Sequence, residues 1–467
     1  MRVRLWGQYV HVSIAVLAAV EGLTFFAAIV LSYRLRLGTW HPDEGPSVTG
    51  TLWICAAAFG IINLVSLLAF GLYSSRQRAR TFGVFVRLIT AIVAATGVTA
   101  IFFYLIPDLL LGRGVLVLSA FFSLIGIGIS RGIFARAIDE SIFKRRVLVY
   151  GVGRRTAAIV GLRRRVDRRG FEIVGFVQPD GESVTVPPER ILDASQGILH
   201  LCSTLDVQEV VVAMEDRRRG FPLLGLLECR LAGIEVTELL TFLERETGRV
   251  RIDVMNPSWM IFGDGFRRDP LRLFSSRMLD LVASLTLLVL STPVLLLTML
   301  AIKLEEGWRA PIFYAQTRVG LGGQPFTVLK FRSMRMDAER DGKAQWAQKG
   351  DPRVTRVGNV IRKLRIDELP QIINVLMGHM SFVGPRPERP QFVAELSQRI
   401  PYYVQRHCVK PGITGWAQLC YPYGSSDHDA LEKLQYDLYY IKNNSLLFDL
   451  AILVQTAEVV FMGKGAR

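Results

Sequence analysis

Two adjacent acids, Asp367 and Glu368, are the residues whose position best suits covalent chemistry. They lie in the segment RKLRIDELPQIINVLMG, residues 362–378, just ahead of an apolar pattern with helical spacing. Neighbouring helical residues point about 100° apart, so one carboxylate could act as a nucleophile while the other handles a metal ion or a proton. The alternative for Asp367 is an ordinary helix N-cap, which is the commonest use of an aspartate at such a place.

Basic residues around the acid pair indicate a phosphorylated substrate. Arg362 and Arg365 lie just upstream, and the positive end of the helix that follows lets a phosphate approach a carboxylate. Lys330 and Arg332 are two residues apart in the block KFRSM, so on a strand they would share a face and could hold a diphosphate together. The alternative for these two residues is a solvated basic strand face.

A third block, SFVGPRPERP at residues 381–390, predicts a rigid loop because it contains three prolines and a glycine. It presents Arg386 and Arg389, and a fixed guanidinium group suits a phosphate better than a mobile lysine does. A structural proline turn is the alternative. The next block, KPGITGWAQL at residues 410–419, has no chemistry that by itself assigns it a role.

The composition limits the kinds of partner. The chain has 467 residues, half of them apolar, and a formal charge of +15, and its mean hydropathy of +0.31 indicates that part of it lies in lipid. The positive charge favours anionic lipid headgroups and phosphorylated substrates, and we expect no nucleic-acid partner because no nucleic-acid-binding signature is present. The five cysteines have no metal-like spacing, which indicates reduced, buried thiols.

Four apolar stretches of membrane-spanning length open the chain. They lie at about residues 11–31, 50–72, 82–106 and 109–130. Clusters of basic residues occur on alternate sides of these stretches. The positive-inside rule therefore places the N-terminus and everything after residue 131 in the cytoplasm.

Three other places combine apolar sequence with ionisable groups. Glu21 and Arg113 lie within or near the first and fourth stretches, and an intramembrane ionisable group suggests a function. The plainer interpretation is an ion pair or a snorkelling contact between neighbouring helices. The last apolar segment, residues 445–462, is interrupted by Asp449 and other polar residues, so it predicts either an amphipathic helix on the membrane surface or a buried core helix.

A further apolar run at residues 278–302 is broken by Pro293. Proline removes a backbone donor and clashes with the preceding turn, so we expect a kink near Ser291 and Thr292. Each half would be only about 15–20 Å long, which is too short for a hydrocarbon core of about 30 Å. Basic residues flank the run on both sides, so we expect both ends to stay cytoplasmic and the segment to enter the membrane and return. A kinked but complete span is the alternative.

A small α/β region separates the four stretches from this run. The segment RVLVYGVGRRTAAIV indicates a buried strand, a glycine turn and a helix, and β-like runs at residues 171–177 and 209–214 fit a parallel sheet. The turn has Gly151 and Gly153, but Thr156 replaces the third glycine or alanine of a dinucleotide fingerprint. A tight turn without bound NAD is favoured. A membrane-anchored NAD-dependent sugar-modifying enzyme stays as an alternative function.

The arginines, the acid pair and the membrane segment together predict phosphoryl transfer to a lipid. The blocks KFRSM, DELPQ, VGPRP and PGITGWAQ, in this order and spacing, resemble the bacterial sugar transferase family, the monotopic polyprenyl-phosphate phosphoglycosyl transferases. The likeness covers residues 268–467. The start of the chain is similar to the long form of that family, which has four N-terminal transmembrane helices and initiates exopolysaccharide or O-antigen synthesis.

The resemblance implies a membrane protein of three parts. A four-helix transmembrane region is expected at residues 1–135 and a central Rossmann-like α/β domain at residues 146–262. The C-terminal part, residues 268–467, is expected to be a mixed α/β phosphoglycosyl transferase domain. That domain would include a re-entrant membrane helix at about residues 275–303, broken at Thr292 and Pro293.

The resemblance also implies a two-step reaction. Asp367 attacks the sugar-bearing phosphate of a UDP-sugar while Mg²⁺, held by Asp367 and Glu368, offsets charge, and UMP leaves. Undecaprenyl phosphate then takes the phosphosugar from the enzyme, which is the first membrane step of exopolysaccharide or O-antigen synthesis. Glu368 is the functional partner of Asp367, while Arg362 and Arg386 bind phosphate.

Partners and location follow from the same likeness. The expected partners are a UDP-sugar, undecaprenyl phosphate and the bacterial inner membrane, with the catalytic domain on the cytoplasmic side of a multi-pass chain and a homodimer as a further expectation. Two positions depart from the family pattern: Thr292 replaces a common serine, and His379 replaces an aspartate. A non-catalytic scaffold of a polysaccharide assembly complex remains another possible function.

Overall fold

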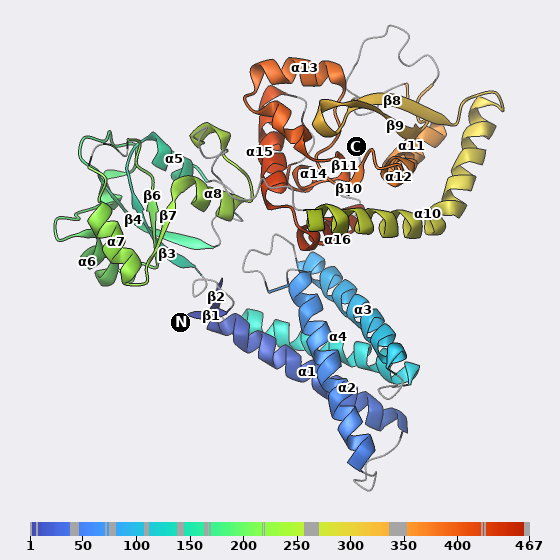
Figure 1. The fold of residues 1–467 in the computed structure, drawn as a ribbon, viewed down its shortest axis with the longest axis horizontal. Helices are drawn as coiled ribbons and strands as arrows, with labels where there is room; N and C mark the ends of the chain where they lie inside the picture. Colours follow the sequence, from blue (N-terminus) through green and yellow to red (C-terminus); the bar gives the residue numbers. More distant parts are fainter. Residues whose placement is uncertain are drawn as a thin grey trace. The chain divides into compact units, whose positions relative to one another are not determined.

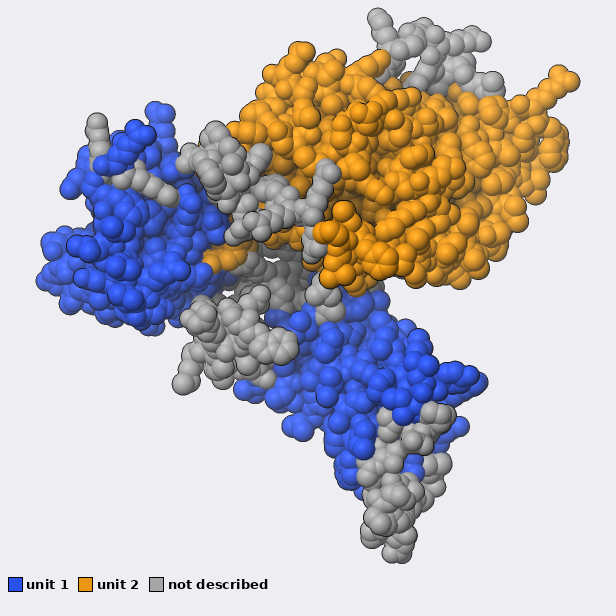
Figure 2. Space-filling view, viewed as in Figure 1, with its two compact units in different colours: residues 1–242 blue, residues 243–467 orange. Residues whose placement is uncertain are grey.

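The computed structural model describes most of the chain as two compact units, residues 1–242 and 243–467, which Figure 2 shows in separate colours. The residues outside the description are 1, 6, 7, 38–45, 71, 74–80, 107–111, 138–143, 163–166, 168, 169, 217, 219, 256–269, 336–352, 422, 423, 425 and 462–467. The predicted domain bounds at residues 262 and 268 lie outside the described residues, as do Arg267 and Arg268 ahead of the predicted re-entrant segment. The division into three domains therefore stays a prediction.

The first unit begins with a strand pair and four long helices. The strands β1 (Arg2–Leu5) and β2 (Gln8–His11) are antiparallel. The helices are α1 (Val12–Leu37), α2 (Pro46–Ala69), α3 (Thr81–Leu105) and α4 (Arg113–Ala137) (Figure 1). Three of them contain segments long and apolar enough to cross a membrane, whereas the described apolar part of α2, Leu52–Leu68, is shorter.

Large apolar side chains and one ion pair hold these helices together. Helix α1 packs against α2 and α4, and the rings of Phe25 and Phe59 meet edge to face with their centroids 6.1 Å apart. Glu21 is fully buried, and the Nε atom of Arg131 lies 2.6 Å from its Oε1 atom. The hydroxyl of Tyr73 also donates to this carboxylate. Glu21 is therefore paired between neighbouring helices, as its plainer interpretation predicted.

A five-stranded parallel sheet completes the first unit. Its strands are β3 (Arg145–Tyr150), β4 (Phe171–Val177), β5 (Ile191–Leu192), β6 (Glu209–Val212) and β7 (Glu235–Glu238), in the order β5-β4-β3-β6-β7. The intervening helices are α5 (Arg154–Val160), α6 (Ile198–Thr204), α7 (Leu223–Leu231) and, after β7, α8 (Leu239–Thr247). All four residues of β6 are buried, as expected for a strand inside a parallel sheet.

The glycine turn between β3 and α5 is closed by the protein's own acids. Gly151 has a φ of +138°, and a Cβ atom there would lie 2.8 Å from the carbonyl carbon of Ala213. The N–H of Val152 donates to Glu182 at 2.8 Å, and the N–H of Arg154 donates to Glu215 at 2.5 Å. Two carboxylates thus take the amides that would face a dinucleotide pyrophosphate. These residues do not fit bound NAD.

The second unit is built around the long helix α10 (Pro270–Glu306). Pro293 lies inside it, and Figure 1 shows the helix bent, which is the expected effect of a proline within a helix. Thr292 donates to the carbonyl of Leu288 at 2.7 Å, a contact that also bends helices. Helix α10 is the fourth described helix that is long and apolar enough to cross a membrane. The chain is a membrane protein.

Short strands and helices make up the rest of the second unit. The strands are β8 (Phe313–Val319) and β9 (Pro325–Phe331), which are antiparallel, and β10 (Ser381–Val383) and β11 (Gly412–Thr414), which are parallel. The helices are α11 (Arg356–Lys363), η7 (Ile366–Glu368), α12 (Gln371–Leu376), α13 (Pro390–Arg399), η8 (Tyr403–Cys408), α14 (Trp416–Cys420), α15 (Asp427–Asn443) and α16 (Leu446–Phe461). Of these elements, α11, α12, α16 and β10 contact α10. Helix α16 packs against β10, β11 and α14 with Asp449 and Ile452 buried, which favours the core-helix alternative.

Candidate active site

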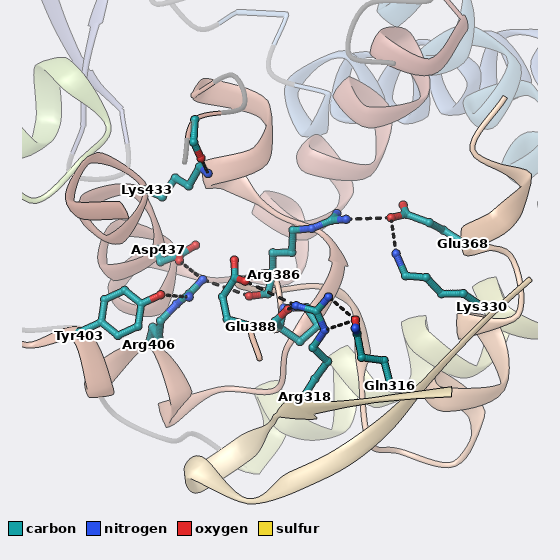
Figure 3. A network of polar contacts seen from close by, with 12 residues as sticks. Gln316, Arg318, Lys330, Glu368, Arg386, Glu388, Tyr403, Arg406, Lys433 and Asp437 are labelled. Atoms are coloured by element: carbon teal, nitrogen blue, oxygen red, sulfur yellow. Dashed lines mark hydrogen bonds and ion pairs between the residues drawn. The ribbon is translucent and has the colours of Figure 1, made fainter. Parts of the chain in front are cut away.

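The structure gathers basic residues around one carboxylate, Glu368, and two of them, Lys330 and Arg386, are predicted site residues (Figure 3). Lys330 Nζ of β9 donates to Glu368 Oε1 at 3.1 Å, and Arg386 Nη2 donates to the same oxygen at 2.9 Å. Arg365 Nη1 lies 3.7 Å from the other oxygen, Glu368 Oε2. Burial alone would raise the pKa of Glu368, but the charges of Arg386, Lys330 and Arg365 outweigh it and hold this pKa far below its usual range. Glu368 is therefore an ionised anchor.

Asp367 is in a different state from its neighbour. It is half-buried and has no hydrogen-bond or ion-pair partner among the residues that the structure describes. Burial and the like charge of Glu368 raise the pKa of Asp367, while Lys330, Arg362 and Arg386 oppose the rise. An acid without a partner, next to several cations, is available to react with an incoming anionic group.

The local backbone explains where the two acids point. The Thr355 side chain accepts from the N–H of Gly358 at 2.8 Å and caps α11. Arg365 then takes a left-handed conformation, with a φ of 57°, which starts the short turn η7 that contains both acids. The residue ahead of α12 is Pro370, with no side-chain cap. Asp367 is therefore not a helix N-cap, and that alternative is wrong.

A buried asparagine fixes the strand that carries Lys330 against the helix that follows the acids. Asn374 of α12 is 2% exposed. Its Oδ1 accepts from the N–H of Leu329 at 3.0 Å, and its Nδ2 donates to the carbonyl of Thr327 at 2.7 Å. Both contacts are to the backbone of β9, so they set the register that brings Lys330 to Glu368.

Further charged side chains support the loop that carries Arg386 (Figure 3). Arg406 Nη2 donates to the carbonyl of Arg386 at 3.1 Å and to Asp437 Oδ2 at 2.8 Å. Arg406 and Asp437 are both at least nine-tenths buried. On the other side of the loop, Arg318 Nη1 donates to the carbonyl of Pro387 at 3.2 Å and lies 3.5 Å from Glu388 Oε2. These contacts hold the proline-rich loop in one conformation.

Burial also changes the pKa of one of these supporting residues, Arg318. Burial lowers this pKa to about 10. The charge of Glu388 opposes the change, and the charges of Arg386 and Arg389 add to it. Arg318 therefore stays charged at neutral pH. None of Arg318, Arg406 or Asp437 was predicted from the sequence, because each belongs to a pair whose members are far apart along the chain.

Helix α10 is fastened to the elements on both sides of the acid pair. Arg277 donates to the carbonyls of Val375 and Leu376, both at 2.7 Å, at the C-terminal end of α12. Near the other end of α10, Glu305 accepts from the N–H groups of Arg356 and Val357, at 2.8 and 2.9 Å, where α11 begins. The acids of η7 lie between α11 and α12 in the sequence.

A buried aspartate adds a third attachment of α10. Asp280 is 3% exposed, and its Oδ1 accepts from the hydroxyl of Ser381 and from the N–H of Phe382, both at 2.9 Å. These two residues belong to β10, the strand that leads directly into the loop of Arg386. Helix α10 is thus bonded to the protein segments before and after the acids.

The comparisons with known proteins agree with this geometry. The family model for "Bacterial sugar transferase" matches residues 271–463. An uncharacterized sugar transferase, EpsL, of Bacillus subtilis is 40% identical over 191 residues, which is 89% of its length and 41% of this chain. The chain belongs to the bacterial sugar transferase family. The acid pair, its cations and the attachments of α10 all lie within the matched residues of this sugar transferase.

Two further relatives extend the comparison. One is the UDP-N-acetylgalactosamine-undecaprenyl-phosphate N-acetylgalactosaminephosphotransferase of Aeromonas hydrophila, which is 45% identical over 242 residues. The chain spans only 56% of the length of that relative, and the match covers 52% of the chain. The other is the UDP-glucose:undecaprenyl-phosphate glucose-1-phosphate transferase of Xanthomonas campestris pv. campestris, 28% identical over 484 residues, covering 99% of this chain and 96% of the relative.

A second family model, described as "CoA-binding domain", matches residues 68–219 of this sugar transferase. The match includes α3, α4 and the sheet from β3 to β6. Coenzyme A carries a pyrophosphate, as NAD does. The amides of the glycine turn are already bonded to Glu182 and Glu215, so the residues there do not fit either pyrophosphate.

The remaining predicted residues are not among the cations bonded to Glu368. Arg332 was expected to share a face with Lys330, but β9 ends at Phe331, and the Arg332 Nε atom instead donates to the carbonyl of Pro311 at 3.0 Å. Arg362 is on α11 and acts on Asp367 through its charge. Thr292 and Pro293 lie in the middle of α10.

A metal ion would have few protein ligands among the residues that the structure describes. Among the described residues no group of three or more His, Cys, Asp or Glu side chains is arranged to hold a metal. Mg²⁺, however, is commonly bound by one or two carboxylates together with substrate phosphates. The Asp367 carboxylate, which has no partner among the described residues, fits that role when a diphosphate supplies the other oxygens.

Proposed function

We propose that this chain transfers a sugar-1-phosphate from a UDP-sugar to undecaprenyl phosphate, giving undecaprenyl-diphosphate-sugar and UMP. The observation that carries the proposal is the division between the two acids. Glu368 is held by Lys330, Arg386 and Arg365, whereas Asp367 beside it has no partner among the described residues. Family membership and the names of the relatives give the reaction class.

In the first step an Asp367 oxygen attacks the phosphorus that bears the sugar. A new O–P bond forms, the bond to the bridging oxygen of the diphosphate breaks, and UMP leaves with that oxygen. The result is an aspartyl phosphosugar. Lys330, Arg362 and Arg386 surround the place where charge develops, and cations fixed in position are the main means by which proteins stabilise such a transfer.

In the second step a phosphate oxygen of undecaprenyl phosphate attacks the same phosphorus. The bond to the Asp367 oxygen breaks, so the free carboxylate returns and the lipid diphosphate-sugar forms. Glu368 keeps the cations in place through both steps because its own oxygens stay bonded to them. Its role is to position Lys330 and Arg386.

Mg²⁺ is the proposed cofactor. Asp367 and Glu368 are the protein groups that would hold it beside the donor diphosphate. When bound, the ion offsets phosphate charge and favours the departure of UMP.

The proposed setting is the bacterial inner membrane, with the catalytic unit facing the cytoplasm, where nucleotide sugars are made. Helix α10 would enter the membrane and return, bent at Thr292 and Pro293. Its exposed apolar side chains, among them Leu285, Val289 and Leu290, would then contact lipid. The central sheet is proposed to be a Rossmann-like accessory domain, and a homodimer is the proposed assembly. The reaction would open exopolysaccharide or O-antigen synthesis.

The test is UMP release from a panel of UDP-sugars with undecaprenyl phosphate and Mg²⁺, using the full chain in nanodiscs. The wild type should release UMP from at least one donor, and Asp367→Asn should release none above background. Intact-mass analysis of the wild type with donor alone should show the added phosphosugar. Absence of UMP from every UDP-sugar with folded protein would refute the proposal.

A further inference from the structure

A pocket of about 170 Å³ lies behind the loop of Arg386. Helices α13 and α15 and the turn η8 form its walls. Two aromatic rings, Phe392 and Tyr403, line it together with the polar side chains of Glu388, Arg406 and Lys433. The proposed two-step reaction uses neither Phe392 nor Lys433, so the pocket has no role in the steps described above.

The pocket is joined to the acid pair by a short chain of contacts (Figure 3). Arg406, in the pocket wall, donates to the carbonyl of Arg386 at 3.1 Å, and the side chain of Arg386 donates to Glu368 at 2.9 Å. Glu388 follows Arg386 by two residues. The charge of Arg386 also acts on Lys433. The loop of Arg386 and Glu388 therefore borders both the acid pair and this pocket.

The polar groups of the pocket are not saturated. Lys433 donates one proton to the carbonyl of Gly424 at 2.9 Å, and an ammonium group has three. The Nε atom of Arg406 is buried without a hydrogen-bond partner among the described residues. Burial lowers the pKa of Lys433. The charges of Glu388 and Asp429 oppose this change, and the charges of Arg386 and Arg406 add to it. The Lys433 ammonium and the Glu388 carboxylate thus line a space with aromatic walls.

These features suit a sugar ring. Hexose hydroxyls both donate and accept, so they can bond to Glu388 and Lys433 at once, and the C–H face of the ring can pack on Phe392. Glu395 and Asp427 also line the pocket, which makes it unfavourable for a phosphate and favourable for several hydroxyl donors. A uracil ring offers only one N–H donor.

Resting on the proposed function, we infer that this pocket holds the hexose of the donor and that Glu388 and Lys433 determine which hexose is accepted. The relatives are named for different sugars, N-acetylgalactosamine in one and glucose in another. A place for sugar discrimination outside the acid pair is consistent with that difference.

The experiment compares kcat/KM for UDP-glucose, UDP-galactose and their N-acetylated forms in the wild type, Lys433→Met and Glu388→Gln. Lys144→Met, the same change in the other unit, is the control. Loss of a hydrogen bond to the sugar should change the ratio between the best and the next donor by about tenfold or more. The inhibition constant for UMP, which has no hexose, should change by less than about twofold.

Other outcomes would overturn the inference. If all donors lose the same factor and the inhibition constant for UMP rises with it, the pocket holds the nucleoside. If both variants keep the wild-type ratios, the pocket does not contact the donor. If the wild type releases no UMP from any donor, the proposed function itself fails. Two separate variants, each checked for folding by size-exclusion chromatography in nanodiscs, keep a folding defect in one from deciding the result.

Discussion

The glycine turn of the first unit and the acid pair of the second unit both bring carboxylates to groups that could bind phosphate, but with opposite results. In the turn, Glu182 and Glu215 bond to the backbone amides of Val152 and Arg154. At the acid pair, Glu368 bonds to Lys330 and Arg386, and Asp367 next to it has no partner among the described residues. The first arrangement closes a potential anion site, whereas the second leaves one open.

The two places differ in how the charge of the donors compares with the charge of the carboxylates that bind them. The amides of the turn are neutral donors, and one carboxylate oxygen satisfies each of them. The cations near Glu368 are full charges, and Lys330, Arg365 and Arg386 together exceed the single charge of Glu368. The excess attracts another anion. A glycine motif or an arginine motif therefore indicates phosphate binding only when its donors are not already taken by the protein.

The largest expected effect separates the two acids. Asp367→Asn should lower UMP release on the order of a thousandfold or more, because the attacking oxygen is lost, and should leave the unfolding temperature close to that of the wild type. Glu368→Gln should lower both, since it loses its charge toward Lys330 and Arg386. Activity and thermal unfolding in nanodiscs measure the two effects. Equal loss of stability in both variants would contradict the assignment of free and anchored acids.

The next largest effect is expected for the ion pair of Arg406 and Asp437. Arg406→Met should destabilise the protein by about 3–5 kcal/mol, because it leaves the charge of Asp437 buried without its partner, and it should lower kcat by releasing the carbonyl of Arg386. The double variant Arg406→Met with Asp437→Leu should recover most of the stability but not the activity. Recovery of both would show that Arg406 has no positioning role.

A smaller effect is expected at the closed site. Replacing Glu182 with alanine should cost about 1–3 kcal/mol because the buried Val152 amide loses its acceptor. Replacing Glu215 should cost less because Arg154 is exposed to water, and UMP release should stay within about twofold of the wild type in both variants. Calorimetry with NAD and with coenzyme A should detect no binding to the wild-type protein. Binding of either ligand by the wild type would show that a pyrophosphate displaces the two carboxylates. It would contradict the description of the glycine turn as a closed anion site.

The smallest expected effect is on pH dependence. Asp367 must be ionised to attack, and its pKa is raised by burial and by Glu368, so activity should fall with decreasing pH earlier than for an ordinary aspartate. Arg362 opposes this rise. Arg362→Gln should therefore move the acid limb of the kcat profile to higher pH, by less than about one unit. A shift to lower pH would contradict the assigned sign.

The sequence indicated which residues meet near the acids better than it indicated the different contacts of Asp367 and Glu368. The meeting of Lys330, Arg386 and Glu368 was expected, because motifs rich in glycine, proline and charge restrict the backbone and limit the possible chemistry. The separation of Arg332 was not expected, since it depends on β9 ending at Phe331. Strand ends depend on tertiary contacts as well as on local propensity.

Contacts between residues far apart in the sequence could not be predicted either. Arg406 and Asp437 are 31 residues apart in sequence, and no local pattern indicates that they meet. The glycine turn was correctly placed between a strand and a helix, but the residues that close it come from two distant loops. The hydropathy pattern gave the long helices well, because length and apolarity are properties of a continuous segment.

The attachments of α10 have a mechanical consequence. Arg277 bonds to the end of α12, and Glu305 bonds to the start of α11, on opposite sides of the bend at Pro293. Any change in the bend angle therefore changes the spacing of the two helices that flank the acids. In the proposed re-entrant arrangement bilayer thickness would act on the bend, so membranes of short and long acyl chains should give different turnover rates. The protein would then convert the thickness of its membrane into the rate of its reaction.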